Sequence, residues 1–326
     1  MRRREFIGSL AGGAMLLGSR AARAGNRVYH LGTLHPALPV TEDDPYGKIL
    51  VKTLAQYGYV IGQNLTFDAR GAMGDITKLP GLVDELKARD VDAIVVTGYP
   101  AALAAKLSGI PTVGTNGLGD PVETRLITSL SHPGGNITGI SDDAAALTTK
   151  RMAMLKEAIP KLRSVAVLWN KDDLGMTLRY QASAKAAQSI GLTVQALGVS
   201  EPDDFNDAFI VMNRDLPGAI LMVSDGLTIL NRKRVFDFAA AKRLPAMYEY
   251  SFLTSDGGLM SYGPDLGESF ARVAALVDRI FQGANPADLP FEQPTRYLFA
   301  VNLKTAKNIG LDFPPQLLAL ADEVIE

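Results

Sequence analysis

Short apolar runs rich in β-branched residues alternate along this chain with longer segments whose apolar residues recur at helical spacing. One such stripe runs from Tyr46 to Tyr57 and stops at Gly58, a usual residue just past the end of a helix. Strict strand-helix alternation predicts parallel sheets with helices on both faces. The predicted fold class is therefore α/β, doubly wound. The predicted strands are 28–34, 65–69, 91–96, 110–113, 137–140, 164–169, 192–198, 218–223, 245–248 and 258–262.

The second half of the chain echoes the first. Residues 89–96 (RDVDAIVV) are matched by 214–223 (RDLPGAILMV), and Ile110-Pro111 by Leu244-Pro245. Chance likeness among α/β segments is the alternative to two copies of one unit. Two copies fit the length, because 326 residues is about two domains. The sequence thus predicts two lobes that face each other across a cleft.

Residues 1–24 have the pattern of an export signal. Arg2, Arg3 and Arg4 precede an apolar run, and Ala22-Arg23-Ala24 offers small residues for cleavage. The alternative is an amphipathic N-terminal helix. The arginines also match the twin-arginine pattern, with ordinary Sec export left open. Loss of five basic residues and one acidic residue with this segment changes the net charge from -2 to -6.

These features predict a periplasmic protein with a cleaved signal. A mildly acidic product has no basic surface for nucleic acid or anionic lipid. No later run reaches the roughly 18 apolar residues of a membrane helix, so we expect no membrane insertion. The sequence contains no cysteine, which leads us to expect no lipid anchor on a cysteine.

The candidate ligand site follows from the strand ends. In open parallel sheets ligands bind beyond the carboxyl ends of the strands, where helix N-termini present free N–H groups. The loops at those positions mix hydroxyls, rings and carboxylates, as small-molecule pockets do. The candidate ligand-binding residues are Leu34, His35, Thr97, Tyr99, Pro100, Thr115, Asp120, Asn170, Asp225, Tyr248, Glu249 and Tyr250.

Each candidate has a second, purely structural interpretation. Thr97 and Thr115 could donate hydroxyls to a ligand carboxylate or cap their own loops. Asp120, which precedes Pro121, is also an ordinary helix cap. Asp225 and Glu249 could hold a ligand ammonium group. The tyrosines, with His35 and Trp169, could stack on an apolar ligand or pack between helix and sheet.

Enzymatic patterns are missing from the sequence. The three histidines, His30, His35 and His132, do not have the spacing of a helical metal site. There is no Gly-x-Ser-x-Gly elbow, and the glycines of 114–119 do not match Gly-x-Gly-x-x-Gly. We therefore expect neither catalysis, nor a metal, nor a cofactor.

Several short strings stand in a specific order along the chain. They are Arg2–Ala14, Gln56–Arg70, Gly119–Val122 (GDPV), Ser129–Gly139 (SLSHPGGNITG), Gly257–Pro264 (GGLMSYGP), Pro286–Pro290, Val301–Leu311 (VNLKTAKNIGL) and the terminal ADEVIE. In these strings the sequence resembles the periplasmic ABC-transporter substrate-binding proteins whose family includes tryptophan- and tyrosine-binding members. The likeness extends over nearly the whole chain.

The resemblance implies a type I periplasmic-binding fold, in which two doubly wound parallel-sheet lobes are joined by three hinge crossings. The lobes would comprise 25–141 plus about 263–290, and 142–262 plus about 291–326. Such a protein would act as a monomer and hand its ligand to an ABC permease driven by a separate ATPase. This chain has no Gly-x-x-x-x-Gly-Lys-Ser/Thr loop of its own.

The ligand class stays open at this stage. Amino acids, and aromatic or aliphatic carboxylates, suit helix N-termini combined with rings. The alternatives to an importer component are a ligand sensor for a membrane receptor and an exported α/β enzyme that acts on a small acid.

Overall fold

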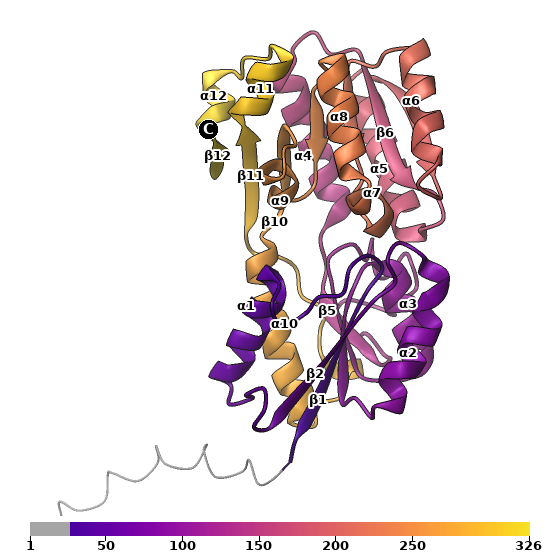
Figure 1. Ribbon diagram of the computed structural model, residues 1–326, viewed down its shortest axis with the longest axis vertical. Helices are drawn as coiled ribbons and strands as arrows, with labels where there is room; N and C mark the ends of the chain where they lie inside the picture. The colour runs from indigo at the N-terminus through magenta and orange to yellow at the C-terminus, as the bar shows by residue number, and fades with distance from the viewer. Residues whose placement is uncertain (1–26) are drawn as a thin grey trace, which may run out of the picture.

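The computed structural model describes residues 27–326, apart from the side chains at 144 and 145. The predicted signal at 1–24 lies outside the described residues. The protein has two lobes stacked along its long axis, each built on one sheet with helices on both faces (Figure 1). The predicted two-lobed α/β fold is confirmed.

The first lobe is built on a five-stranded parallel sheet in the order β2-β1-β3-β4-β5. Its strands are β1 (Tyr29–His35), β2 (Leu65–Gly71), β3 (Ala93–Thr97), β4 (Thr112–Thr115) and β5 (Ile137–Ile140). Its helices are α1 (Pro45–Gln56), α2 (Leu79–Ala88), α3 (Tyr99–Ser108) and α10 (Leu266–Phe281), with 3-10 turns at η1 (Ile76–Lys78) and η2 (Pro286–Asp288).

Both faces of this first sheet are buried. Along β3, Ala93 and Val95 pack towards α1 and α10, whereas Ile94 and Val96 pack towards α2 and α3. This two-sided burial explains why the strands appear in the sequence as continuous apolar runs rather than as alternating ones. Asp75, which marks a helix start in the sequence, caps η1, the turn that leads directly into α2.

The second lobe is built on a seven-stranded sheet in the order β12-β11-β10-β9-β8-β6-β7. Its strands are β6 (Ser164–Asn170), β7 (Thr193–Val199), β8 (Ala219–Met222), β9 (Ala246–Tyr248), β10 (Met260–Pro264), β11 (Tyr297–Asn302) and β12 (Glu323–Ile325). Its helices are α4 (Ala144–Ala158), α5 (Leu174–Ser189), α6 (Asp204–Arg214), α7 (Gly226–Leu230), α8 (Arg232–Lys242), α9 (Ser251–Ser255), α11 (Leu303–Ile309) and α12 (Pro315–Leu318).

The chain passes between the lobes three times. The crossings are the segment 141–143 after β5, Asp265 between β10 and α10, and the segment 282–296 that leads to β11. Helix α10 therefore belongs to the first lobe although second-lobe strands precede and follow it. Figure 1 shows it in orange beside the indigo α1. Its Phe270 and Val273 belong to the same apolar cluster as Leu50 and Leu54 of α1.

All ten predicted strands are present within a few residues, but β11 and β12 are additional. β11 is also antiparallel to β10, which departs from the expectation of purely parallel sheets. The reason is the excursion to α10. β10 ends at the boundary between the lobes and β11 begins there, so the two neighbouring strands must run in opposite directions. Among the described residues, no helix is both long and apolar enough to cross a membrane.

Candidate ligand-binding cleft

A cavity of about 130 Å³ lies between the two lobes, at the carboxyl ends of β1, β3 and β4 in one lobe and of β8 and β9 in the other. Helices α1 and α10 close one side of it, and α7 and α9 contribute from the opposite lobe. The residues that line this cleft cavity are His35, Pro36, Val40, Tyr46, Thr97, Gly98, Asn116, Gly117, Asp173, Ser224, Asp225, Gly226, Ile229, Tyr250, Phe252, Leu266 and Phe270.

The lobes touch each other next to this cavity. At Gly226, an added Cβ atom would lie 3.1 Å from the carbonyl carbon of Pro36 in the first lobe. At Gly175 on α5, an added Cβ atom would lie 3.1 Å from the Leu118 oxygen and 3.1 Å from Tyr99 Cβ. Glycine at both positions lets the two backbones approach this closely. The conformation described is therefore closed.

Two buried carboxylates from the second lobe face the cavity. Asp173 caps α5 and accepts the Met176 N–H at 3.2 Å. Asp225 caps α7 by accepting the Thr228 N–H at 2.9 Å, and Asn170 Nδ2 donates to it at 2.7 Å. Burial, and next the charge of Asp225, raises the pKa of Asp173 well above its usual range. Burial raises the pKa of Asp225 as well.

No lysine or arginine stands among the described residues that line the cavity. His35 does not supply the missing positive charge. Its Nδ1 accepts the Ala37 N–H at 2.8 Å, and burial lowers the pKa of the ring to about 4. At neutral pH His35 is thus a neutral imidazole whose proton, by inference from this hydrogen bond, sits on Nε2. The cleft thus holds two carboxyl groups whose ionised forms are disfavoured, and a cationic group on a ligand would stabilise those ionised forms.

Several buried polar atoms at the cavity have no hydrogen-bond partner within the described part of the chain. They include Asn116 Nδ2 and Ser224 Oγ, both from residues that line the cavity, and Thr115 Oγ1 at the end of β4. Asn116 also has a positive φ of 46°, a conformation that asparagine tolerates better than most residues. Buried polar groups are nearly always paired in folded proteins, so these atoms are candidate donors and acceptors for a ligand.

An aromatic wall lines the cavity from both lobes. Tyr46 of α1 stacks on Phe270 of α10, with ring centroids 5.4 Å apart. In the second lobe, Tyr250 stacks on Phe252 at 5.9 Å. Tyr46 and Phe252 meet edge to face across the lobes at 6.5 Å. These four rings give the cleft a surface suited to an apolar or aromatic group.

The N-terminus of α3 also reaches the cavity. Gly98, which lines the cavity, is the N-cap residue of α3 and provides no side-chain hydrogen bond to the helix. Its φ of 83° lies in the region that favours glycine. The Tyr99 N–H is bonded to the Gly117 carbonyl at 2.9 Å and Pro100 has no N–H, so it is the positive end of the helix dipole, rather than a row of free N–H groups, that favours a carboxylate here.

Four of the twelve predicted site residues line the cleft cavity, namely His35, Thr97, Asp225 and Tyr250. Four others adjoin it. Thr115 is buried with a free Oγ1, Asn170 holds Asp225, and Tyr99 and Pro100 begin α3, with Tyr99 at the contact to Gly175.

The remaining four lie elsewhere. Leu34 packs in the first-lobe core. Asp120 is exposed and accepts the N–H groups of Val122 and Glu123 in a turn; no helix begins at Pro121, so the side chain caps a turn and not the predicted helix. Glu249 is held by two arginines and by the Ser224 N–H.

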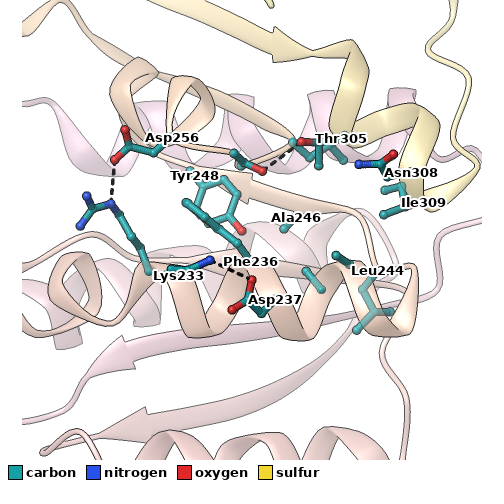
Figure 2. Close-up of a pocket in the computed structure, with 16 residues that line it drawn as sticks. Lys233, Phe236, Asp237, Leu244, Ala246, Tyr248, Asp256, Thr305, Asn308 and Ile309 are labelled. Carbon is teal, nitrogen blue, oxygen red and sulfur yellow. Dashed lines mark hydrogen bonds and ion pairs between the residues drawn. The ribbon is translucent and has the colours of Figure 1, made fainter.

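Tyr248 faces a different cavity, of about 560 Å³, lined by α8, β9, the loop 256–259 and α11 (Figure 2). None of the residues that line it lines the cleft. The charged side chains at this cavity are already paired, Arg232 with Asp256 at 2.8 Å and Lys233 with Asp237 at 3.4 Å.

Sequence reasoning missed Asp173, Asn116, Tyr46, Phe252 and Phe270. Asp173 carries a usable signal, because an aspartate directly before a helical stripe and directly after a strand marks a helix start at the strand end. Tyr46 and Phe270 lie in helical stripes, which predict burial but not the cavity that a side chain faces.

Comparisons with known proteins agree with this geometry. Residues 41–325 match the protein family described as "ABC transporter substrate binding protein". The "Tyrosine-binding protein" of Clostridioides difficile (strain R20291) is 24% identical over 279 residues, which cover 85% of this chain and 78% of that protein.

Two solved structures share the fold. One is a conserved domain protein from Vibrio cholerae O1 biovar El Tor, with a TM-score of 0.84, 22% identity, and coverage of 91% of this chain and 100% of that chain. The other is an ABC domain from Streptococcus pneumoniae in complex with L-Trp, with a TM-score of 0.82, 23% identity, and coverage of 91% and 100%.

Proposed function

Because this chain belongs to the ABC transporter substrate-binding protein family, we propose that it binds an amino acid with an aromatic side chain in the cleft between its lobes. Proteins of this family bind solutes and are not enzymes. As the solute-binding component of an importer, this protein would hold the zwitterionic amino acid in the closed cleft and present it to a membrane permease.

The observation that carries this proposal is the charge of the cleft. The carboxyl groups of the buried Asp173 and the partly buried Asp225 line it, and no lysine or arginine in the described part of the chain lines it with them. A ligand with only a carboxylate would add a third negative charge to a site that already disfavours two. A ligand ammonium group would instead neutralise the carboxylates and donate hydrogen bonds to them. This supports amino acids over the simple carboxylates that the sequence left open.

The other two parts of an amino acid also find partners. The uncapped start of α3 at Gly98 suits the ligand carboxylate. The rings of Tyr46, Tyr250, Phe252 and Phe270 suit an aromatic side chain. The cavity of about 130 Å³ is smaller than the roughly 300 Å³ at which pockets for drug-sized ligands begin, so the ligand is small. The names of the relatives, a tyrosine-binding protein and a complex with L-Trp, support the same class.

Closure supplies the affinity. The carboxylates belong to the second lobe, whereas Gly98, Tyr46 and Phe270 belong to the first. A ligand that contacts both sets binds the closed state more tightly than the open state and shifts the population towards it. The three crossings at 141–143, Asp265 and 282–296 would act as the hinge.

Titration calorimetry with three compounds of matched size tests the proposal. The compounds are L-tyrosine, tyramine, which lacks the carboxylate, and 3-(4-hydroxyphenyl)propionate, which lacks the ammonium group. We expect L-tyrosine to bind and the propionate to show no measurable binding, because it cannot neutralise Asp173 and Asp225. Equal binding of the propionate and L-tyrosine would refute the charge argument. L-tryptophan and L-phenylalanine then rank the side-chain preference.

We also propose that the protein works in the periplasm after cleavage of residues 1–24. The pattern at Arg2–Arg4 and Ala22–Ala24 supports this. N-terminal sequencing of the protein recovered from the periplasm tests it, with residue 25 expected as the first residue. A permease and its ATPase encoded beside this protein, rather than a membrane receptor, would identify the importer role.

A further inference from the structure

A network of four buried charged side chains lies behind the cleft. Arg151 of α4 and Arg179 of α5 both donate to Glu249, the first to Oε1 at 2.9 Å and the second to Oε2 at 2.8 Å. Arg179 also makes an ion pair with Asp142, in the first crossing between the lobes. The side chains of all four residues are only 3% exposed. Two guanidinium groups balance two carboxylates, so the network is neutral.

This network connects groups that line the cleft in both lobes. Asp142 accepts the Gly117 N–H at 2.8 Å, which fixes a cleft residue of the first lobe. Glu249 accepts the Ser224 N–H at 2.9 Å, which fixes one of the second lobe. The Arg179 guanidinium also hydrogen-bonds the hydroxyl of Tyr250, a third cleft residue. Arg179 itself is not among the residues that line the cleft.

The two arginines differ in one respect. The partners of Arg151 all belong to the second lobe, namely Glu249 and the Tyr262 carbonyl, which its Nε donates to at 2.6 Å. Arg179 has partners in the second lobe and also Asp142, which is tied to the first lobe through Gly117. Only an arginine has the planar fork of donors that serves two carboxylates and a hydroxyl together.

We propose that Arg179 is the positioning residue that holds the two lobes in their closed arrangement and thereby sets ligand affinity without touching the ligand. Its ion pair with Asp142 joins α5 to the first crossing between the lobes. Its bond to Glu249 fixes Ser224 and Tyr250, which line the cleft from the second lobe. Removal of its side chain leaves both carboxylates buried without their shared partner. The opening of the lobes, which admits water to Asp142 and Glu249, relieves that penalty. The effect on affinity rests on the proposed amino-acid function; the effect on lobe closure does not.

Arg179→Met and the matched control Arg151→Met separate this role from general stabilisation. Both substitutions remove one buried guanidinium bonded to Glu249, but only the first breaks the link to Asp142. The chain has no cysteine, so Leu107→Cys on α3 and Ile210→Cys on α6 provide unique labelling positions, one in each lobe and both exposed. Spin labels at these positions report the distance between the lobes in the ligand-free protein.

We expect Arg179→Met to shift the interlobe distances towards longer values, and Arg151→Met to leave them as in the parent protein. L-tyrosine affinity, measured by calorimetry, should fall at least about tenfold for Arg179→Met. It should stay within about threefold for Arg151→Met, because the link from Arg179 to Asp142 remains in that variant. Dissociation should accelerate for Arg179→Met, because the closed state is what retains the ligand.

Unchanged distances in Arg179→Met, or equal changes in both variants, would overturn the proposal. So would a lowered melting temperature of Arg179→Met with parental distances and affinity, since that is the signature of a merely structural residue. Should Arg179→Met fail to fold, Arg179→Lys decides the question. It keeps the buried charge but cannot bridge Asp142 and Glu249, so it too should open the lobes. Failure of the unsubstituted protein to bind any aromatic amino acid would refute the proposed function, while the distance measurement still decides the role of Arg179.

Discussion

The contact at Gly175 permits a direct test of whether lobe closure controls ligand binding. Gly175 lies in the first turn of α5, and a methyl group there would sit 3.1 Å from the Leu118 oxygen and 3.1 Å from Tyr99 Cβ, both in the opposite lobe. It would also lie 3.2 Å from an Asp173 oxygen. These distances are a few tenths of an ångström too short for comfortable contact, and the carbonyl of Leu118 cannot move by a rotamer change.

Gly175→Ala should therefore disfavour the closed state more than the open state, in which only the contact with Asp173 of the same lobe remains. In the open state the methyl group meets no first-lobe atom, and alanine favours the helix over glycine by about 1 kcal/mol. In the closed state, overpacking of this kind costs about 1 to 3 kcal/mol. Since the ligand needs both lobes, that cost appears in binding as a loss of about 5- to 150-fold in affinity. The ligand-free protein should be at least as heat-stable as the parent.

Calorimetry with L-tyrosine and melting curves with and without ligand measure both effects. Gly81→Ala in α2 is the matched control, because a Cβ atom there meets nothing within 4 Å and should change stability without changing affinity. Gly226→Ala provides a second interlobe contact, with Pro36 and Ala37 at 3.1 to 3.2 Å, and should behave like Gly175→Ala. Parental affinity in both interlobe variants would refute the view that these contacts form when the ligand is bound.

Four further predictions concern the groups that line the cleft. Asp173→Asn should weaken L-tyrosine binding by about 2 to 5 kcal/mol, because it removes the partner of the ammonium group, and calorimetry measures the loss. In the absence of ligand and at neutral pH, the same variant should melt at a higher temperature than the parent. Burial raises the pKa of Asp173 above its value in the unfolded chain, so ionisation of this carboxyl group lowers the stability of the folded protein as pH rises. The amide of asparagine does not ionise and removes that cost. The affinity of the parent protein for L-tyrosine should fall as pH is lowered from neutral towards mildly acidic values. The ligand pairs with the ionised form of Asp173, so ligand binding must release the proton that the raised pKa retains. A pH-independent affinity in the parent, or the same pH slope in Asp173→Asn, would contradict this. Phe270→Ala should lower the free energy of unfolding by about 3 to 5 kcal/mol, measured by denaturant titration, because Phe270 is buried in the core between α1 and α10. The fraction of this variant that folds should bind L-tryptophan more weakly, as measured by calorimetry.

The rule that ligands bind at strand ends located the cleft from sequence because that rule depends only on strand order and direction. His35 and Thr97 end parallel strands, Asp225 and Tyr250 follow parallel strands within three residues, and all four line the cavity. The rule gives a position along the chain but not what else packs there. Glu249 occupies an equally suitable position, yet two arginines from α4 and α5 neutralise it.

The other residues depend on contacts between distant parts of the chain. Phe270 faces the cleft only because α10 leaves the second lobe and packs beside α1. The apolar stripe of α10 predicts that one face of the helix is buried, but it does not predict which lobe buries that face. Tyr248 shows the converse, since it follows the strand pattern correctly but its ring points to the opposite face of the sheet, into the cavity of Figure 2. Tyr248 is the last residue of β9, whereas Tyr250, which lines the cleft, lies beyond the end of the strand, where the alternation no longer applies.

The return of α10 to the first lobe also determines the order in which the protein can fold during synthesis. Strands β1 to β5 and helix α1 leave the ribosome first, but Leu50 and Leu54 find their partners only when residues 266–281 have been made. Until then the nascent first lobe exposes an apolar helix face and one side of its sheet. The lobe that is translated first is thus completed last, and a chain truncated before Leu266 would lack part of both lobes and would be prone to aggregate.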